Sequence, residues 1–540
     1  MSTEPVRPLL PLSTLHAIEP EILDAEILDD DVESQIILVD VEHRVVTRTI
    51  ARLASICSDL YQRAGVLVRV VTPVECGTKI HRPTIVEADS KWLRDQISRV
   101  GQFQVRARQG WRISLVPEWL PGMVGSRGAF PGVRPLRAVV ESPVFLGDGR
   151  VLGHAGYDLE SGLLLASQVP AVPVLESPTH EDAVQSAATL LAVVIDFPFA
   201  FDPSQDAHRA AWLAAVLTIV ARHAIDGPVP AFMADASSQA SGKGLLIQIT
   251  HIIATGRPAS AMPCSGEKEE LRRAVFPVLL EGRRVGWIDE ALSPFGGGAW
   301  NALTTAWPTY SDRVTRTSST PELPALSCWF ISGNNIRLSA DTTRRTLVAR
   351  LEPTVDRPED RSDFKHQHLL SWVQEQQPRL LAAALTILRA YHVAGRPTVF
   401  STPVGSYEAW DALVRQAVGW VMGVDPMAPR NAMAAMVDLR RRAWEDLVDE
   451  LWGMFGTGEF TARDAVVELG GSQATEAGAM AVEELMGGKA VTPRTFATTV
   501  LSAHRGVVAH GLRLEIANPH SNRGVVFRLA RLAKHGGNND

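Results

Sequence analysis

The stretch Ala231–Thr250, AFMADASSQASGKGLLIQIT, joins three kinds of segment in a fixed order. An apolar run at 230–234 suits a buried strand, small polar residues follow at 235–241, and a second apolar run after the Gly-Lys-Gly triplet can start a helix. Small residues let backbone N–H groups approach phosphates, and a helix N-terminus adds partial positive charge. The stretch therefore predicts a phosphate-binding loop whose lysine reaches the terminal phosphates. The residues expected to bind the nucleotide are Ser241, Gly242, Lys243, Gly244 and Leu245.

Two positions depart from the usual pattern G-x-x-x-x-G-K-[ST]. Ser237 stands where the pattern has its first glycine, and Gly244 stands where it has serine or threonine. The second departure matters more, because that hydroxyl normally ligates Mg²⁺ and a water would have to replace it here. The alternative interpretation is a loop rich in glycine and serine that merely contains a lysine.

A pair of carboxylates provides the second chemical signal. The apolar strand expected at Val285–Ile288 ends in Asp289 and Glu290. In a phosphate-loop ATPase, one carboxylate at such a strand end holds Mg²⁺ and a neighbouring one activates water. We expect Asp289 to hold Mg²⁺ through water and Glu290 to act as the general base. The alternative is a strand followed by an acidic residue that caps a helix.

A third apolar strand, expected at Leu326–Ile331, leads into an Asn-Asn pair. An asparagine amide both donates and accepts hydrogen bonds, so Asn335 is expected to orient the attacking water. Arg344 and Arg345 follow at a predicted helix-to-strand junction, where an arginine can stabilise phosphoryl charge from a neighbouring subunit. The alternatives are an ordinary turn for the asparagines and a solvent-exposed face for the arginines.

Composition restricts the class of protein. With 540 residues the chain is too long for one core, and about three or four domains are expected. The apolar run 210–221 is too short to span a bilayer. The four cysteines show no C-x-x-C spacing, which argues against a zinc site and a disulfide framework. No basic and apolar signal segment is evident near residue 1, so we expect a cytoplasmic location and no membrane partner.

Shifts in composition divide the chain into five expected parts. Residues 1–35 are acidic and rich in proline, which is typical of a disordered arm. An N-terminal α+β module follows at 36–170, includes a pair of β-hairpins at 144–166, and is interpreted as a docking or oligomerisation module. The phosphate-loop core is expected at 180–355 and a helical lid and connector at 356–452. The last expected part is 455–540.

The last part has the pattern of a winged helix. Three helices are expected at 461–469, 474–485 and 492–504, and two strands at 512–517 and 524–529, joined by 518–522. Basic residues are concentrated here although the whole chain carries a net charge of −7, which indicates contact with duplex DNA. The alternative is a winged helix that binds protein. The expected DNA contacts are Arg494, Arg505, Arg513, Arg523 and Arg528.

The order of the motifs resembles a known family. SGKGLL (241–246), WIDEA (287–291), FISGNN (330–335) and DTTRRTLVARLEP (341–353) are similar to the AAA+ ATPase part of phage and plasmid replication proteins of the superfamily-three helicase type. The resemblance implies an α/β AAA+ P-loop core that forms a hexameric ring and hydrolyses ATP with Mg²⁺ at subunit interfaces. It also implies that single-stranded DNA passes through the ring, where Arg313 and Arg316 are candidate contacts; the alternative is that both are ordinary surface arginines.

The expected function is therefore an ATP-dependent DNA helicase or translocase that acts in the replication of a phage, plasmid or other mobile element. The alternative is an ATP-binding, DNA-binding initiator or scaffold protein with little or no hydrolysis, which Gly244 favours. A metabolic phosphate-loop kinase is a more distant alternative. The basic C-terminal part and the Asn-Asn and Arg-Arg pairs count against it.

Overall fold

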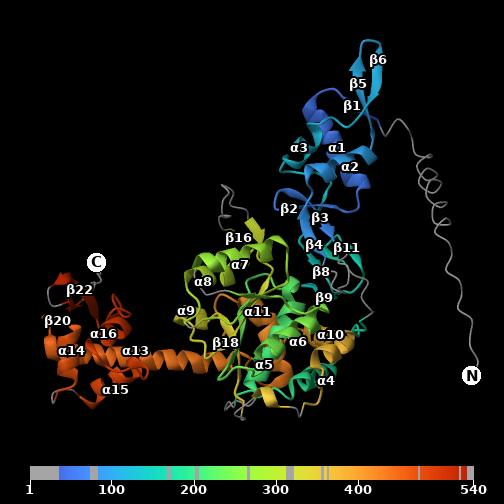
Figure 1. Ribbon diagram of the computed structural model, residues 1–540. Helices are drawn as coiled ribbons and strands as arrows, with labels where there is room; N and C mark the ends of the chain where they lie inside the picture. The colour runs from blue at the N-terminus through green and yellow to red at the C-terminus, as the bar shows by residue number, and fades with distance from the viewer. Residues whose placement is uncertain are drawn as a thin grey trace, which may run out of the picture.

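The fold has three parts in chain order, an N-terminal module, a central part built on a parallel sheet, and a C-terminal module at the end of a long helix (Figure 1). The expected acidic arm lies outside the residues that are described. The computed structural model describes residues 36–72, 83–166, 172–200, 206–263, 268–292, 294–311, 322–353, 358–361, 364–471, 475–521 and 524–531.

The N-terminal module combines three helices with two small sheets. The helices are α1 (Glu42–Ile56), α2 (Ser90–Arg99) and α3 (Leu120–Gly125). The first sheet has the order β1 (Ile36–Val39), β5 (Gln102–Ala107), β6 (Gly110–Ser114). The second has the order β4 (Thr84–Glu87), β3 (Val66–Val71), β2 (Leu60–Arg63), β7 (Arg134–Pro135). Helix α3 lies within the stretch 117–135, which contains four prolines.

Two short hairpins connect this module to the central part, as predicted for 144–166. The first pairs β9 (Val144–Phe145) with β10 (Val151–Leu152), and the second pairs β11 (Gly156–Asp158) with β12 (Leu163–Leu165). A further strand, β8 (Ala138–Val140), runs parallel to β12. Ser142, between β8 and β9, donates a 2.6 Å hydrogen bond to the carbonyl oxygen of Ala254 in the central part.

The central sheet has five strands, all parallel. Their spatial order is β14 (Ala261–Pro263), β15 (Val285–Asp289), β18 (Cys328–Asn334), β13 (Ala231–Ala236), β19 (Thr346–Leu351). Parallel strands point their carboxyl ends at one edge, so the segments that follow β13, β15 and β18 meet there. The three strands that end in the predicted site residues are direct neighbours.

Each face of the central sheet packs against its own hydrophobic core. Alternate residues of one strand enter different cores, because successive side chains of a strand point to opposite faces. Phe232 packs against the first set of helices, which are α4 (His180–Leu191), α5 (Ala207–Val220), α6 (Lys243–Thr255) and α10 (Leu369–Val393). Met233 packs against the second set, α7 (Lys268–Leu280) and α8 (Gly298–Thr305).

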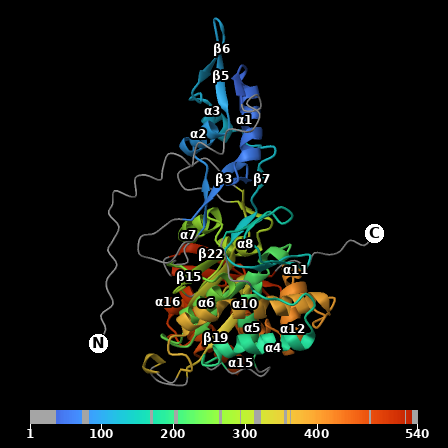
Figure 2. The same cartoon turned by 90° about the vertical axis from the view of Figure 1, so that its right-hand side faces the viewer.

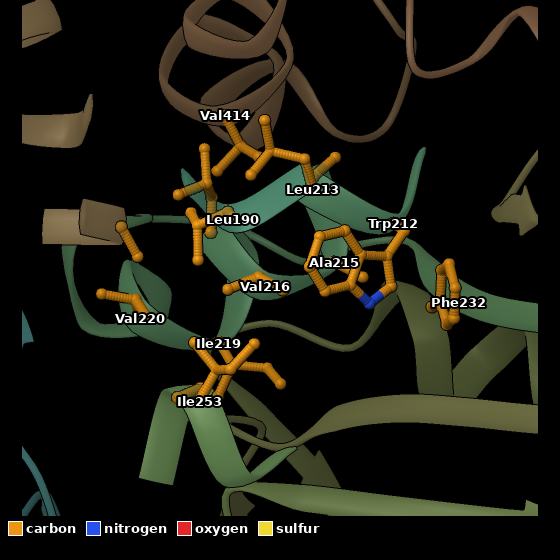
Figure 3. Packing of buried hydrophobic residues seen from close by; sticks show 14 of the residues in the cluster. Leu190, Trp212, Leu213, Ala215, Val216, Ile219, Val220, Phe232, Ile253 and Val414 are labelled. Atoms are coloured by element: carbon orange, nitrogen blue, oxygen red, sulfur yellow. The ribbon is translucent and has the colours of Figure 1, made fainter. Parts of the chain in front are cut away.

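Helix α5 is buried on every side. No polar stripe runs along the helix, and its side chains lie close to Leu190 of α4, Phe232 of β13 and Ile253 of α6 (Figure 3). Helix α10 also packs against it. The Trp212 indole N–H donates a 2.8 Å hydrogen bond to the Thr250 hydroxyl, which satisfies this buried polar group. The run at 210–221 therefore belongs to a core helix. Among the described helices, none combines the length and the apolar character needed to cross a membrane.

Helices follow the central sheet and lead to the C-terminal module. They are α11 (Glu408–Trp410), which continues as a π-helical turn at 411–415, α12 (Gln416–Met422) and α13 (Ala428–Phe455). Helix α13 leaves the central part and reaches the C-terminal module (Figure 1). Its second half contributes Trp444, Leu447 and Leu451 to the core of that module. The boundary expected at 452–455 therefore falls inside a helix.

The C-terminal module contains helices α14 (Ala462–Leu469), α15 (Glu476–Met486) and α16 (Pro493–Phe496), the last continuing as a π-helical turn at 497–501. Its antiparallel sheet has the order β20 (Glu459–Thr461), β23 (Gly524–Arg531), β22 (Leu512–Ser521), β21 (Val508–Ala509). The three helices and two strands were predicted. The connection predicted at 518–522 was wrong, because β22 continues to Ser521 with shifts of register after Ile516.

Replacing Leu217 of α5 tests this arrangement. Leu217 is fully buried, so Leu217→Ala removes packing and leaves a cavity, and we expect the free energy of unfolding to fall by about 2–5 kcal/mol. Val184→Ala on α4 is the control, because that side chain is 39% exposed. Urea denaturation followed by circular dichroism measures both. Equal stability of the two variants would contradict the buried position of α5.

Candidate functional site

Residues of the loop between β13 and α6 form hydrogen bonds with one another. Ser241 Oγ donates a 2.6 Å hydrogen bond to the Ser238 carbonyl oxygen. Ala240 (φ +56°) and Gly242 (φ +91°) are in the left-handed region, which favours glycine. A β-carbon on Gly242 would lie 3.3 Å from the Phe197 ring. Both the backbone and the packing therefore favour glycine here, and α6 begins at the next residue, as predicted.

The Lys243 ammonium lies where the loop meets the carboxyl edge of the sheet. Its Nζ donates a 2.7 Å hydrogen bond to Asn334 Oδ1 and a 3.1 Å hydrogen bond to the Ser238 carbonyl oxygen. Burial lowers the pKa of the Lys243 ammonium, while the nearby carboxylates of Asp235 and Asp289 act in the opposite direction. An ammonium, two carboxylates and an amide from β13, α6, β15 and β18 therefore share one site.

A hydrogen-bonded chain fixes the Asp289 carboxylate. Ser332 Oγ donates a 2.5 Å hydrogen bond to Asp289 Oδ1, and the Trp287 indole N–H donates a 2.8 Å hydrogen bond to Ser332 Oγ. The backbone N–H of Glu290 donates to the same Asp289 oxygen at 3.0 Å. Sequence reasoning missed Ser332 and Trp287. One signal in the sequence could have identified Trp287. It precedes Asp289 by two residues, so the two side chains lie on the same face of the strand.

Glu290 occupies an unusual backbone position. Its φ of +53° is uncommon for a residue other than glycine, and its side chain is exposed. Such conformations often occur at functional sites, where the surrounding structure maintains them. Here the hydrogen bond from the Glu290 N–H to Asp289 and the bond from the Ala291 N–H to the Ser332 carbonyl oxygen, at 2.9 Å, hold the turn. The carboxylate is open to solvent beside the Asp289 side chain.

The amide beside Lys243 belongs to Asn334, so the assignment to Asn335 needs a correction. Asn335 Nδ2 instead donates a 3.1 Å hydrogen bond to the Ser237 carbonyl oxygen, and Arg350 Nη2 donates to Asn335 Oδ1 at 3.0 Å. Strand β18 ends at Asn334, and Asn335 turns into the left-handed region at φ +47°. Asn335 therefore supports the loop, whereas Asn334 reaches the ammonium.

Arg350 is another residue that sequence reasoning missed. It lies on β19 next to β13, forms an ion pair with Asp235, and donates a 2.8 Å hydrogen bond to Glu352. Asp235 Oδ1 also accepts a 3.0 Å hydrogen bond from the Ile336 N–H. Together with the Asn335 contact, these bonds join β13, β18 and β19 directly below the loop.

The paired arginines lie at the other edge of the sheet. They precede β19, which starts beside the first residue of β13, whereas Lys243 follows the last residue of β13. Arg345 is only 8% exposed and pairs with Asp341 at 3.2 Å, so it serves the fold and its expected role as a phosphoryl-stabilising group needs a correction. The Arg344 side chain is 51% exposed and pairs with the same carboxylate at 2.5 Å.

The predicted DNA contacts differ in their surroundings. Arg313, Arg316 and Arg523 lie outside the described residues. Arg494 and Arg505 are exposed. Hydrogen bonds from Arg513 and Arg528 lower the pKa of the Glu515 carboxyl, and Arg528 Nη2 lies 3.1 Å from it. Two of the expected contacts therefore already have an acidic partner.

The donor set of the site fits a magnesium–triphosphate ligand. Within the described ranges, no group of three or more His, Cys, Asp or Glu side chains is arranged to hold a metal by itself. Mg²⁺ commonly takes one or two protein carboxylates and completes its shell with waters and phosphate oxygens. The half-buried Asp289 carboxylate beside the Lys243 ammonium offers that combination.

Replacement of the two arginines separates their roles. Arg345→Ala removes a buried guanidinium that pairs with Asp341, so we expect the free energy of unfolding to fall by about 1–3 kcal/mol. Arg344→Ala is the matched control and should leave stability unchanged, because exposed ion pairs contribute little. Thermal unfolding measures both variants. Equal destabilisation by the two substitutions would contradict this assignment.

The chain is similar to several solved structures, whereas no protein-family model and no curated protein matches it. The C-terminal region of NrS-1 is 12% identical, and the match covers 83% of this chain and 100% of that chain with a TM-score of 0.33. The structure titled SCCmec type IV Cch, active helicase, is 10% identical over 86% and 91% of the two chains, with a TM-score of 0.32. The JCV helicase is 12% identical over 45% and 66%, with a TM-score of 0.20.

Proposed function

We propose that this chain is an ATP-dependent DNA helicase or translocase with an AAA+ P-loop core, acting in the replication of a phage, plasmid or other mobile element. One observation carries the proposal. The Lys243 ammonium, at the start of α6, lies 2.7 Å from the Asn334 amide oxygen and beside the Asp289 carboxylate. These groups come from distant parts of the chain, and together they supply the charges that a bound triphosphate requires.

Each part of the site has a role in binding. Lys243 exchanges its contacts with Asn334 and Ser238 for oxygens of the terminal phosphates, and the N–H groups at the start of α6 add to the positive field. When bound, Mg²⁺ supplies neutralising charge to the phosphates, and Asp289 is the carboxylate that would hold it. Trp287 and Ser332 keep that carboxylate oriented. Gly244 offers no hydroxyl, so a water takes that place.

The proposed hydrolysis uses a proton acceptor and an orienting amide. The exposed Glu290 carboxylate accepts a proton from the attacking water, and the Asn334 amide orients that water once Lys243 has moved to phosphate. Arg344 lies at the opposite edge of the sheet from Lys243 and cannot serve the site of its own chain. It would therefore serve the site of a neighbouring subunit, which is why we propose a ring of subunits, hexameric as in the resembling family.

We propose that the C-terminal module is a winged helix that binds duplex DNA, while single-stranded DNA passes through the ring. Helices α14 to α16 and the β22–β23 hairpin have the required order. Arg494, in the first turn of α16, and Arg505 are exposed and available for phosphates. Arg513 and Arg528 would exchange Glu515 for phosphate. The candidate channel contacts remain Arg313 and Arg316.

A second candidate function is an initiator or scaffold protein that binds ATP and DNA with little hydrolysis. Gly244 supports it, because the missing hydroxyl is a normal ligand of the catalytic metal. The two candidates share the same nucleotide site and the same partners. They differ in the rate of ATP hydrolysis, which we test with two sets of variants.

The first set removes the proposed catalytic groups. We expect Lys243→Ala to abolish ATP hydrolysis because phosphate binding is lost, and Glu290→Gln to lower kcat by about 10²–10⁴ because the proton acceptor is lost. The control is Glu322→Gln, an exposed carboxylate on β17 (Glu322–Pro324), which should leave the rate unchanged. Phosphate release with and without single-stranded DNA is measured. Full activity of Glu290→Gln would contradict its role, and no turnover of the natural sequence with DNA and Mg²⁺ would favour the initiator.

The second set restores the missing hydroxyl. A β-carbon at Gly244 would lie 3.6 Å from the Trp287 ring, an ordinary contact distance, so serine fits. We expect Gly244→Ser to raise the ATPase rate severalfold and to lower the Mg²⁺ concentration needed for half-maximal rate, because the new hydroxyl can ligate the metal. Gly244→Ala adds the same β-carbon without the hydroxyl and is the control. Identical Mg²⁺ titrations for serine and alanine would show that the hydroxyl has no such role.

A further inference from the structure

The β5–β6 hairpin projects from the end of the N-terminal module that lies farthest from the central sheet (Figures 1 and 2). Strand β6 is at the edge of its sheet, because the order is β1, β5, β6. One face of the sheet packs on the module, where Ile37 and the Phe103 opposite it are both buried. One face of the hairpin therefore packs against the rest of the N-terminal module.

The other face carries an aromatic ring and polar side chains. The antiparallel register places Arg106 opposite Trp111 and Gln104 opposite Ile113, and residues opposite each other share a face. Trp111 is 45% exposed and Ile113 is 68% exposed. Trp111 and Ile113, two residues apart on β6, share this face, and covering their exposed apolar surface with a ligand is favourable.

Every charged side chain of the hairpin is basic. The segment 102–114 contains Arg106, Arg108 and Arg112 and no acidic residue, within a chain whose net charge is −7. All three arginines are exposed. Among the described residues, none of the three forms an ion pair with a carboxylate. This contrasts with Arg99 on α2, which pairs with Asp95 at 3.1 Å, and with Arg513, which pairs with Glu515.

We propose that this face of the hairpin binds single-stranded nucleic acid. The ring of Trp111 stacks on an unpaired base, Arg106 on the same face and Arg108 in the turn contact phosphates, and the Gln104 amide reaches a base edge. Arg112 lies opposite Val105 on the other face and adds to the positive field of the hairpin. Stacking on a side chain requires a base face that a duplex conceals, which is why the strand must be single. Charge complementarity favours this ligand over an apolar protein surface, since Arg106 shares the face of the ring, Arg108 and Arg112 belong to the same hairpin, and none of the three pairs with a described carboxylate.

The proposal is independent of the proposed ATPase activity. The hairpin lies apart from the nucleotide site, and stacking with phosphate contact needs no hydrolysis. The binding experiments therefore use the full chain without ATP, and they are repeated in the Lys243→Ala variant. If hydrolysis is absent and the hairpin still binds, only the proposed function fails. If hydrolysis is present and the hairpin does not bind, only this proposal fails.

Fluorescence anisotropy with a labelled single-stranded oligonucleotide tests the ligand. We expect Trp111→Ala to weaken binding by at least about fivefold with an unchanged salt dependence, and Trp111→Phe to retain most of the affinity because the stacking face remains. Reversal of Arg106, Arg108 and Arg112 to glutamate should weaken binding at least tenfold. It should also reduce the slope of log affinity against log salt by about 1.4, the value for two lost phosphate contacts on a single strand.

A matched control reverses the same number of charges elsewhere in the module. Arg44, Arg94 and Arg99 are exposed on α1 and α2 and are not part of the hairpin, so their reversal to glutamate should change the affinity less than twofold. An equal loss of affinity in both triple variants would mean that the general field of the module, and not the hairpin, attracts DNA. That result would overturn the proposal.

Photo-crosslinking separates the hairpin from other DNA contacts of the chain. An oligonucleotide that contains 5-iododeoxyuridine is irradiated with the full chain, and the modified peptide is identified by mass spectrometry. We expect an adduct at Trp111 that an excess of single-stranded DNA removes and an excess of duplex does not. Equal competition by duplex would overturn the proposal. The lack of an adduct within 102–114 would also overturn the proposal. This holds if residues 1–35 cover the face, and equally if a protein partner covers it.

Discussion

The hydrogen bond from the Lys243 ammonium to the Asn334 amide is the contact on which the rest of the structure depends. It forms because β13 and β18 are parallel neighbours whose last residues reach the same edge of the sheet. Strand β15 lies on the other side of β18 and brings Asp289 to that edge. A different strand order would place the same three side chains apart, and the chain would then contain separate polar residues without a common site.

The remainder of the central part keeps this edge in place. Two hydrophobic cores cover the two faces of the sheet, and the buried helix α5 supports α6, whose first residue is Lys243. Below the edge, Trp287 and Ser332 hold Asp289, while Arg350 and Asp235 join three strands. The left-handed backbone at Glu290 and Asn335 is the local strain that the packed sheet sustains.

Local patterns in the sequence predicted the loop, the start of α6 and the Asp-Glu strand end, because each depends on neighbours in the chain. The individual partners in contacts between distant segments could not be predicted. Asn334 and Asn335 are equivalent by composition, and only the residue at which β18 ends decides which amide faces Lys243. Arg345 is buried by packing near Tyr407, far along the chain, so nothing local distinguished it from Arg344. A boundary was expected at 452–455, yet packing with the C-terminal module continues α13 to Phe455.

A structure of the full chain with Mg²⁺ and a non-hydrolysable ATP analogue is the measurement that tests the central claim most directly. The account predicts the triphosphate on the loop 237–242, with Lys243 Nζ transferred from Asn334 to a terminal phosphate oxygen and the metal on the side of Asp289. A nucleotide bound elsewhere, or a Lys243 ammonium that remains on Asn334 while the analogue is bound, would contradict it.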